Sequence, residues 1–383
     1  MKILAIETSC DETACAVVED GTKIISNVVA SSRDMHEKYG GIVPEVAARE
    51  QLKSILPVIR EALFPLKKDP SMPVLQCLNK SIDAIAVTIG PGLIGSLLVG
   101  VETAKTIAYV TGKPIIPVNH VIAHMYANFV NSAGKRKEES VKNINFPAIS
   151  LVVSGGHTEL YLMKSIKEVQ WLGGTLDDAA GEAFDKTARL LGFGHGGGAA
   201  IEGAAARFQP TPYPLRQSSR EASNVPASPK LPRGEQPATQ LPRPLLHDKT
   251  LNFSFSGLKT AVLREVNKLK QSHQFNNETI QQLAHEVQEA ITDVLVEKTI
   301  RAAREYDVNS ILLSGGVAAN SRLREKFTLH PSRFTLAFPP VSLCTDNAVY
   351  IASCAYYLGK KVSWKDITAI PDLSVEVRTA VKE

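Results

Sequence analysis

The sequence predicts an α/β protein built from two similar lobes, and three observations support this prediction. At 383 residues the chain is long enough for two units of roughly 150 residues each. Each half begins with three short strand-like runs and then alternates helices with buried apolar strands. Apolar strands that end in a Ser-Gly-Gly loop occur twice, at Ser154 and at Ser314. An internal duplication accounts for all three features.

The first half is predicted to have the element order βββαβαβα. Two apolar runs at 2–7 and 14–19 are followed by the turn Asp20-Gly21 and a third run at 23–30. After these we expect a helix at 45–63, a loop at 71–80, a strand at 82–89, a helix at 93–110, a strand at 115–118 and a helix at 120–129. The run at 82–89 is continuously apolar, which is typical of a strand covered on both faces.

The second half repeats the pattern around an interruption. We expect strands at 148–153, 158–163 and 169–172, helices at 177–191, 257–270 and 278–306, a strand at 310–313, then a helix, a strand at 333–338 and a final helix near 346–358. Residues 209–247 contain nine of the 22 prolines and are expected to form a long solvated loop.

This pattern predicts two lobes. The first covers 1–130, with the final helix at 345–360 packing back onto it. The second covers 131–344 and carries the insertion 209–247. The architecture of actin, Hsp70 and the sugar kinases is built in this way.

Composition excludes several classes of protein. Hydrophobic residues make up 44% and charged residues 21%, which excludes general disorder and a collagen-like repeat. The five cysteines form no CxxC pair and are interpreted as reduced thiols of a cytoplasmic protein. The longest uncharged run contains Gly90-Pro91-Gly92, so a strand, a turn and a helix are expected there and not a membrane span. We expect no signal peptide, because an apolar strand begins at the second residue.

Glycine loops after apolar strands are candidates for phosphate binding. Glycine lets backbone N–H groups approach a phosphate closely because it has no Cβ. The loops at Ser154-Gly155-Gly156 and Ser314-Gly315-Gly316 have this form, and we expect them at matching positions in the two halves. One such loop alone is more often an ordinary turn. A third glycine cluster ends at Gly198 and precedes Glu202, whose carboxylate could reach a ribose hydroxyl.

Two histidines suggest a metal site. His120 and His124 are one helical turn apart, so they share a face of the predicted helix. That spacing suits a shared metal ion, although two unrelated surface histidines have the same spacing. Asp346, at the start of the last helix, is a plausible third ligand. Two histidines and a carboxylate suit iron or zinc.

Carboxylates in turns offer further candidates. Asp11 and Glu12 lie between the first two strands, where they could position a nucleophile or help hold a metal. An ordinary polar turn has the same composition. Asp178 could equally be the N-cap of a helix, and Asp185 could simply pair with Arg189 one turn later.

Eight longer motifs stand in the order of one protein family. They are Ile6-Glu7-Thr8-Ser9-Cys10-Asp11-Glu12-Thr13, Gly41-Ile42-Val43-Pro44-Glu45, Gly90-Pro91-Gly92-Leu93, Asn119-His120 with His124, Val153-Ser154-Gly155-Gly156-His157-Thr158, Asp177-Asp178-Ala179-Ala180-Gly181-Glu182-Ala183-Phe184-Asp185-Lys186, Phe253-Ser254-Phe255-Ser256-Gly257-Leu258-Lys259 and Ser314-Gly315-Gly316-Val317-Ala318-Ala319-Asn320. On these motifs the sequence resembles the tRNA adenosine threonylcarbamoyltransferases (TsaD), formerly described as glycoproteases or O-sialoglycoprotein endopeptidases. The resemblance covers nearly the whole chain outside 209–247, and the start at Met1 resembles the bacterial branch.

The resemblance implies an actin/Hsp70-like (ASKHA) fold and a transfer reaction. The threonylcarbamoyl group would pass from threonylcarbamoyl-AMP to the exocyclic amine of the adenosine 3′ of the anticodon, in tRNAs that read codons beginning with adenine. The resemblance implies that His120, His124 and Asp346 hold one divalent metal, Fe(II) or zinc. It further implies a substrate phosphate loop at Val152, Val153, Ser154, Gly155 and Gly156, and nucleoside contacts at Asp185, Gly198, Glu202 and Asn320.

The same resemblance implies partners and a mechanism. The partners are a TsaB-like paralogue and a TsaE-like ATPase, which fits a net charge of only +4 for a tRNA-binding chain. Basic candidates for tRNA contact are the run Lys135-Arg136-Lys137 and the group Lys259, Lys268 and Lys270, although such runs are more often solvated charges. Because the donor is an activated mixed anhydride, no covalent enzyme intermediate is required. We assign Asp11 and Glu12 to orienting the acceptor amine or taking its proton.

Three positions depart from the family pattern. The family's Tyr-Pro-Gly-Gly-Pro reads His195-Gly196-Gly197-Gly198-Ala199 in this chain, Gln51 stands where histidine is usual, and Val152 stands where archaeal relatives carry a metal-binding tyrosine. Two rival functions stay open at this point. A metallopeptidase needs a glutamate where the chain has Val121, and an ASKHA phosphotransferase would not need the histidine pair.

Overall fold

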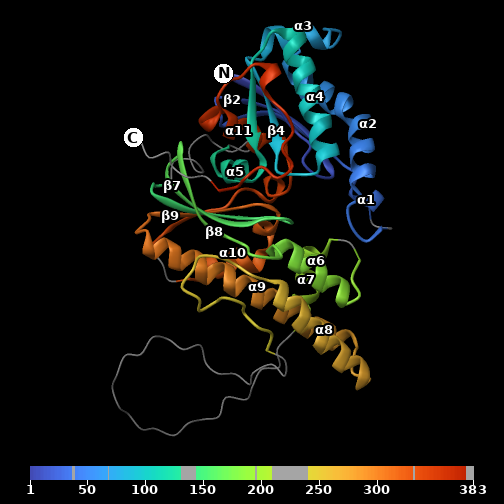
Figure 1. The fold of residues 1–383 in the computed structure, drawn as a ribbon, viewed down its shortest axis with the longest axis vertical. Helices are drawn as coiled ribbons and strands as arrows, with labels where there is room; N and C mark the ends of the chain where they lie inside the picture. Colours follow the sequence, from blue (N-terminus) through green and yellow to red (C-terminus); the bar gives the residue numbers. More distant parts are fainter. Residues whose placement is uncertain are drawn as a thin grey trace.

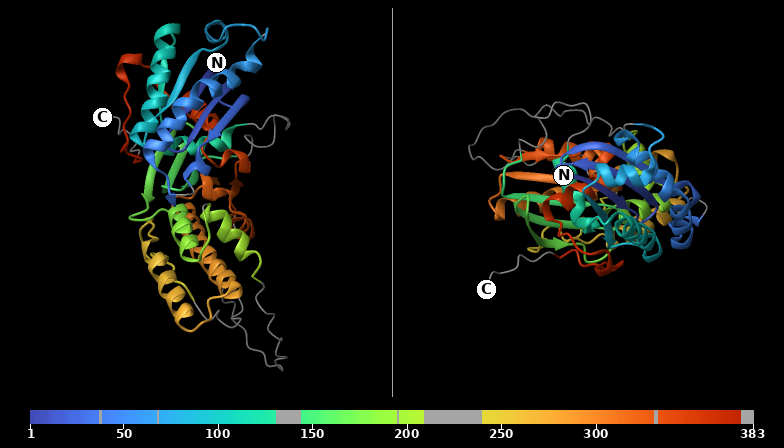
Figure 2. Two further views of the ribbon diagram at one scale, coloured as in Figure 1. Left: turned by 90° about the vertical axis from the view of Figure 1, so that its right-hand side faces the viewer. Right: turned by 90° about the horizontal axis from the view of Figure 1, so that it is seen from above.

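The chain folds into two α/β lobes, each built on one five-stranded sheet (Figure 1). The computed structural model describes residues 1–36, 39–67, 69–130, 144–194, 196–208, 240–330 and 333–376. Figure 2 shows the lobes end to end, with the blue and cyan helices of the first at one end and the green to orange helices of the second at the other. Among the described helices, none combines the length and the apolarity needed to cross a bilayer.

The two sheets have the same topology. The strands of the first are β1 (Lys2–Glu7), β2 (Glu12–Glu19), β3 (Lys23–Ser31), β4 (Ala84–Gly90) and β5 (Ile115–Asn119), in the order β3-β2-β1-β4-β5. The strands of the second are β6 (Ala148–Val153), β7 (Thr158–Ser165), β8 (Glu168–Gly174), β9 (Ser310–Ser314) and β10 (Thr335–Ala337), in the order β10-β9-β6-β7-β8. Each sheet joins an antiparallel three-strand meander to two parallel strands. The predicted duplication is therefore confirmed.

The sequence predicted one Ser-Gly-Gly loop in each half of the duplication, and this prediction was wrong. Both belong to the second sheet, where β6 and β9 are parallel neighbours and Val152 pairs with Ser314. Their equivalents in the first sheet are the acidic turn after β1 and the Gly90-Pro91-Gly92 turn after β4. The prediction was wrong because a loop motif does not reveal which strand of a duplicated sheet it follows.

Eleven α-helices complete the described part of the chain. Those of the first half are α1 (Arg33–His36), α2 (Pro44–Leu63), α3 (Val74–Ser81), α4 (Ile94–Thr111) and α5 (His120–His124). Those of the second half are α6 (Ala180–Leu190), α7 (Gly197–Ala205), α8 (Ser256–Gln271), α9 (Asn277–Glu305), α10 (Ser321–Leu329) and α11 (Ala348–Leu358). Short 3₁₀ helices are η2 (Phe64–Leu66), η3 (Met125–Phe129), η4 (Gly316–Ala319), η5 (Val341–Leu343) and η6 (Trp364–Asp366).

Two helices differ from the sequence prediction. The expected loop at 71–80 contains α3, which starts after Pro73 and buries Cys77 and Leu78 on one face. The glycine cluster before Glu202 opens α7, which we did not predict because glycine disfavours helix interiors. A Cβ at Gly197 would lie 2.5 Å from the Cα of Asp185, so glycine is what lets α7 approach α6 this closely.

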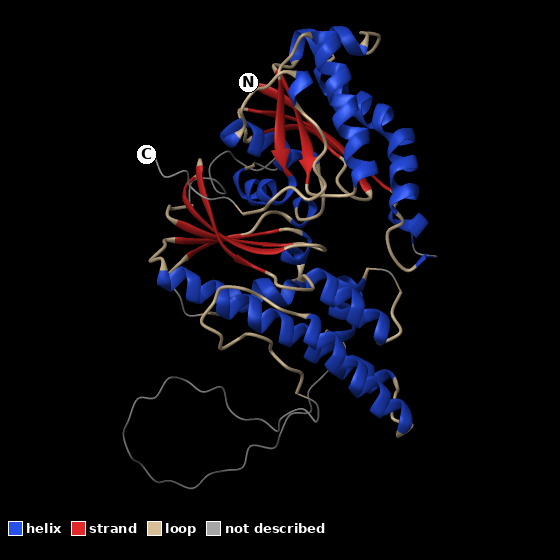
Figure 3. Ribbon diagram, in the orientation of Figure 1, coloured by secondary structure: helices blue, strands red, loops and turns tan. Residues whose placement is uncertain are grey.

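Helices and sheets are stacked in layers (Figure 3), and three apolar clusters lie among them. One face of the first sheet is covered by α2, α3 and α4, and one face of the second by α6 to α10. The middle layer lies between the sheets and combines α5, η3 and α11 with residues of both. Helix α11 comes from the end of the chain but packs against β1 and β2 of the first sheet.

The end of the proline-rich insertion packs on the second lobe. Leu241 is buried in the second-lobe core, and Arg243 forms ion pairs with Glu286 at 3.4 Å and with Asp293 at 3.1 Å. The expectation of a solvated loop over 209–247 is therefore wrong for 240–247, since one leucine and one arginine are enough to anchor it. Residues 209–239 lie outside the described residues, as does the basic run at 135–137.

Candidate metal centre and adjoining phosphate loop

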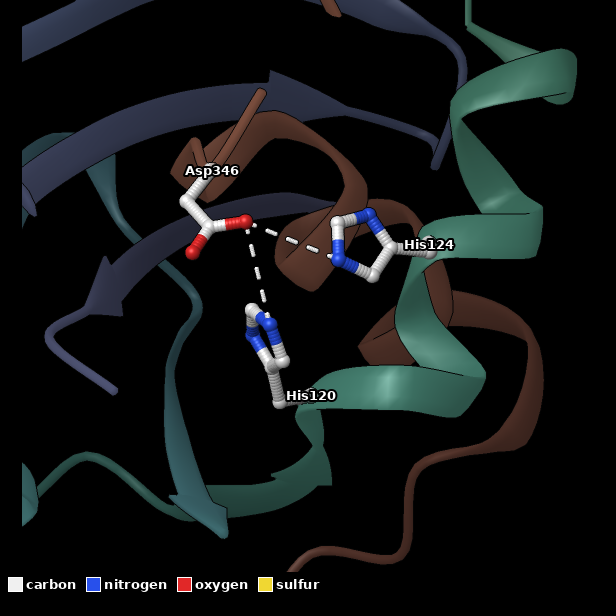
Figure 4. A group of neighbouring side chains, drawn as sticks. All are labelled: His120, His124 and Asp346. Atoms are coloured by element: carbon white, nitrogen blue, oxygen red, sulfur yellow. Dashed lines mark ion pairs between the residues drawn. The ribbon is translucent and has the colours of Figure 1, made fainter. Parts of the chain in front are cut away.

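The short helix α5 presents both histidines to one point. The Asn119 side chain accepts hydrogen bonds from the N–H groups of Val121 and Ile122, which caps α5 directly after β5. Asp346 approaches from the loop before α11, and its Oδ1 lies 3.7 Å from Nε2 of His120 and 3.6 Å from Nε2 of His124 (Figure 4). The structure thus brings the three predicted metal ligands together.

The three side chains suit a divalent transition metal. One ligand atom from each lies within 4.8 Å of the others. His124 is fully buried, and within the described part of the chain neither of its ring nitrogens has a hydrogen-bond partner. Buried polar atoms are rarely left without a partner, so these nitrogens indicate a missing ligand. Burial, with the neighbouring His120, holds the pKa of His124 well below its usual range, so its imidazole is in the neutral form that binds metals.

Glu7 is a contributor to this centre that the sequence analysis did not single out. Its Oε2 lies 3.0 Å from Nδ1 of His120, and it also accepts hydrogen bonds from the Ser9 N–H and the Thr88 hydroxyl. Burial opposes a charge on His120, but the carboxylates of Glu7 and Asp346 outweigh burial and raise the pKa of His120 to about 9. The available signals were the place of Glu7 in the first family motif and its position at the end of β1, beside the acidic turn.

The acidic turn lies against the same centre. Burial and the nearby carboxylates of Asp346 and Asp11 raise the pKa of Glu12 to about 10. Without a metal, Glu12 is therefore protonated at neutral pH and can donate a hydrogen bond. Burial also raises the pKa of Asp346. A cation bound among these carboxyl groups would favour their charged forms.

The predicted phosphate loop follows β6 and is open at its glycines. Among the described residues, and apart from its chain neighbours, a Cβ added at Gly155 or at Gly156 would meet no atom within 4 Å. Val152 and Val153 are buried in β6, so their side chains support the loop and do not line it. Gly315, with φ +89°, packs against the backbone of Val153, and this contact leaves no room for a side chain.

The phosphate loop includes His157, whose pKa responds to the charge of a candidate metal ligand in the other lobe. His157 closes the loop, with its carbonyl accepting from the Ser154 N–H at 2.8 Å. Burial and then the charge of His120 lower the pKa of His157 to about 4. His157 belongs to one of the family motifs, but its sequence position predicts no role.

Two of the four predicted nucleoside residues, Asn320 and Glu202, lie together at the start of α10. Asn320 caps this helix through the Leu323 N–H, and its Nδ2 donates to Gln288 at 3.1 Å and to Glu202 at 3.4 Å. Glu202 also accepts from the Ser321 N–H at 2.9 Å. These bonds join α7, α9 and α10 around one polar group.

The other two nucleoside candidates lie where α6 meets α7. Gly197 packs against Asp185, whereas a Cβ at Gly198 would meet open space. Arg189 does not form the side-chain ion pair with Asp185 that we left open, since its Nε donates to the backbone carbonyl of Asp185 and its Nη1 to that of Gly40. Arg189 thus links the second lobe to the first.

Two aspartates at the start of α6 have structural partners. Asp178 does not cap α6, whose N-cap is Ala179, and instead pairs with Lys186 at 2.7 Å. Asp177 accepts from the Phe255 and Ser256 N–H groups, at 2.7 and 3.2 Å, and so serves the first turn of α8. These contacts explain the Asp-Asp and Phe-Ser-Phe-Ser motifs structurally.

Comparison with known proteins identifies the family. The family profile described as tRNA N6-adenosine threonylcarbamoyltransferase, TsaD, matches residues 23–353. A protein of this name from Thermomicrobium roseum is 45% identical over 378 residues, which covers 94% of this chain and 93% of that one. Another, from Dehalococcoides mccartyi strain CBDB1, is 45% identical over 377 residues and covers 98% and 99% of the two chains.

Solved structures agree on the fold. HypF from T. kodakarensis superposes with a TM-score of 0.52 at 13% identity, over 93% of this chain and 47% of that one. A full-length HypF in a phosphate- and nucleotide-bound form gives a TM-score of 0.51 at 12% identity, over 93% and 46% of the two chains. These likenesses support the two-lobed architecture alone, whereas the range matched by the family profile includes His120, His124 and Asp346. The chain belongs to the tRNA N6-adenosine threonylcarbamoyltransferase family.

Proposed function

We propose that this chain transfers the threonylcarbamoyl group from threonylcarbamoyl-AMP to the exocyclic amine of an adenosine in tRNA. The acceptor is the adenosine 3′ of the anticodon in tRNAs that read codons beginning with adenine. The observation that carries the proposal is the family match over residues 23–353, together with relatives 45% identical over nearly their full length. Membership of this family makes the chain an enzyme.

In this proposal the second lobe binds the donor. The open backbone at Gly155 and Gly156 receives the phosphate, and the polar group of Asn320 and Glu202 receives the nucleoside. Asp185 and the open face at Gly198 complete the nucleoside contacts. The donor carbonyl is already activated, so these residues need only hold the phosphate and exclude water while the amine attacks.

We further propose one divalent metal, Fe(II) or zinc, held by His120, His124 and Asp346. The unpartnered nitrogens of His124 and the mixed nitrogen and oxygen donor set support this assignment. Such an ion would supply a Lewis acid for the donor's oxygens. Glu7 holds the His120 ring in place through the contact at Nδ1.

Asp11 and Glu12 are assigned to the acceptor side. The charge of Asp11 raises the pKa of Asp346, and the charge of Asp346 raises the pKa of Glu12. A protonated Glu12 suits the orienting of the amine through a hydrogen bond. A charged carboxylate suits removal of its proton.

The two rival functions are not favoured. Peptide hydrolysis at a zinc-type centre needs a general base beside the first histidine, and Val121 fills that position with a fully buried apolar side chain. A phosphotransferase of this fold has no use for the buried histidine pair. Neither rival explains the long sequence match.

The partners and the location are part of the proposal. We propose a TsaB-like paralogue and a TsaE-like ATPase, because a net charge of +4 is small for a chain that binds tRNA alone. Lys259, Lys268 and Lys270 are exposed on α8 and could contact tRNA. All five cysteines are free thiols, which supports a cytoplasmic location.

A transfer assay tests the proposal. Labelled threonine in threonylcarbamoyl-AMP should appear in an anticodon-loop tRNA as threonylcarbamoyladenosine, with the partner proteins present. Asp11→Ala and Glu12→Ala should slow transfer while leaving adenylate binding intact, and Asp69→Ala, in an exposed loop, is the matched control. Metal-dependent cleavage of a glycoprotein, with no modified adenosine, would favour the peptidase instead.

A further inference from the structure

Gln51 makes an unusual set of contacts with the acidic turn. It lies on α2 and is fully buried. Its Nε2 lies 3.0 Å from the carbonyl oxygen of Cys10, 3.0 Å from that of Glu12 and 3.4 Å from that of Thr8. One amide group thus spans alternate carbonyls along the whole turn.

The remaining carbonyls of the turn are also held by the first lobe. The Ser9 carbonyl accepts from the Leu93 N–H at 2.8 Å, and that of Asp11 accepts from the Ser32 N–H at 3.0 Å. The Cys10 carbonyl accepts a second bond from the Ser96 hydroxyl, also at 3.0 Å. Every carbonyl from 8 to 12 is therefore bonded, and Gln51 contacts three of the five.

The contacts determine which way the amide points. All three neighbours are carbonyl oxygens, so the NH₂ group must face them. This leaves Oε1 buried with no hydrogen-bond partner among the described residues, a penalty of about 1–3 kcal/mol for such a group. A leucine would avoid that penalty and fill a similar volume. A buried glutamine is useful here only because it donates to the turn.

We propose that Gln51 is a positioning residue that holds the backbone of residues 8–12, so that the carboxyl groups of Asp11 and Glu12 meet the substrate in a fixed geometry. The carbonyls of the turn are bonded to Gln51 of α2 and to neighbouring residues of the first lobe, so the backbone that carries both carboxyl groups is held in place. The effect of Gln51 on catalysis rests on the proposed function. The restraint of residues 8–12 by Gln51 is independent of that function.

Two substitutions of Gln51 and one control test the inference. Gln51→Leu removes both donors at similar volume. Gln51→His keeps one ring N–H and should restore part of the restraint. Ile55→Val is the control, because Ile55 lies one turn later on α2 in the first-lobe core and none of its atoms bonds to the turn. Its loss of one methylene should lower stability by about 1 kcal/mol without loosening residues 8–12.

The first measurement is amide hydrogen exchange, which is independent of any activity. Gln51→Leu should raise exchange at residues 8–13 by at least tenfold, Gln51→His should give an intermediate increase, and Ile55→Val should give none there. Unchanged exchange at 8–13 in both Gln51 variants would overturn the inference. If Gln51→Leu fails to fold, the comparison of amide exchange at residues 8–13 between Gln51→His and Ile55→Val still shows whether Gln51 restrains the turn.

The second measurement separates geometry from binding. In the transfer assay Gln51→Leu should lower kcat by about tenfold to a hundredfold, with KM for threonylcarbamoyl-AMP within about threefold, because the donor binds in the other lobe. Gln51→His should recover part of kcat. An equal loss of kcat in Ile55→Val would overturn the inference by showing a general packing effect. If the unmodified protein itself transfers nothing, the proposed function fails while the exchange experiment still decides the restraint.

Discussion

The carboxylate of Glu7 lies 3.0 Å from Nδ1 of His120, although the two residues are 113 positions apart in the chain. Both are buried, and Glu7 is itself fixed by hydrogen bonds from Ser9 and Thr88. In the neutral form of His120, which metal binding requires, an Nδ1–H that donates to Glu7 leaves Nε2 unprotonated and directed toward Asp346. The end of β1 therefore determines which nitrogen of His120 is free for a metal.

Glu7→Gln should weaken metal binding by about tenfold to a hundredfold. The new amide can donate to Nδ1, which shifts the ring proton to Nε2 and blocks the ligand atom. Titration of the apoprotein with Zn(II) measures the effect. Glu159→Gln is the control, because Glu159 is a buried carboxyl of the second lobe whose partner is Trp171 at 2.7 Å. Equal Zn(II) affinity in Glu7→Gln and the unmodified protein would contradict the role of Glu7.

The sequence alone was enough for the duplicated fold and for the His120, His124 and Asp346 group. Buried strands are marked by continuous apolar runs, and helical spacing places two histidines on one face. The link between Glu7 and His120 could not be predicted, because it depends on β1 and β5 flanking β4 in one sheet. Local patterns carry no such information.

Helices α3 and α7 were missed for different reasons. Helix α3 is short and lies beside a loop-like sequence, so its apolar face at Cys77 and Leu78 was too brief to give a clear period. In α7, tight packing against α6 outweighs the low helix propensity of Gly197. The position of both Ser-Gly-Gly loops in the second sheet likewise depends on strand order, which a local motif does not reveal.

The double variant His120→Ala/His124→Ala should lose nearly all bound metal. Removal of both rings leaves Asp346 as a single carboxylate, which is too few ligands to hold a transition metal. Elemental analysis of purified protein measures the metal content per chain. His330→Ala removes a histidine outside the site and should retain the metal. Unchanged metal in the double variant would rule out this centre.

Gly155→Val should abolish adenylate binding without unfolding the protein. A side chain at Gly155 meets open space, so it adds no clash within the fold but occupies the proposed position of the phosphate. Gly315→Val is the contrasting variant, because its Cβ would collide with the Val153 backbone at a positive φ and should destabilise the lobe. Calorimetric titration with a nonhydrolysable adenylate and thermal melting distinguish the two. Normal adenylate affinity in Gly155→Val would contradict the phosphate assignment.

Replacement of 209–239 by a short Gly/Ser linker should leave the melting temperature nearly unchanged. The prediction for this segment rests on its high proline content and few large apolar residues. Extension of the deletion to 247 should lower the melting temperature by several degrees, because it removes the buried Leu241 and the ion pairs of Arg243. Equal melting of the two deletions would show that 240–247 contributes nothing to stability.

Glu289 should stabilise the second lobe in a pH-dependent way. Burial alone would raise its pKa, but Arg322 at 2.7 Å and Lys326 at 3.0 Å outweigh burial and lower the pKa to about 2. The pKa is about 4.3 in an unfolded chain. A carboxyl whose pKa is lower in the folded state adds stability above the unfolded value, and that stability is lost as pH falls from about 5 to about 2.

Glu289→Gln should therefore cost about 2–3 kcal/mol at pH 7 and less than half of that near pH 3. The loss matters for the site because Arg322 and Lys326 belong to α10, whose first residue follows Asn320. Urea unfolding at both pH values measures it, with Glu325→Gln as control. Glu325 also pairs with Arg322 but is half exposed, so its loss should change stability by less than about 1 kcal/mol. A destabilisation by Glu289→Gln that is equal at pH 7 and pH 3 would show that packing, and not the ion pair, holds α10 against α9.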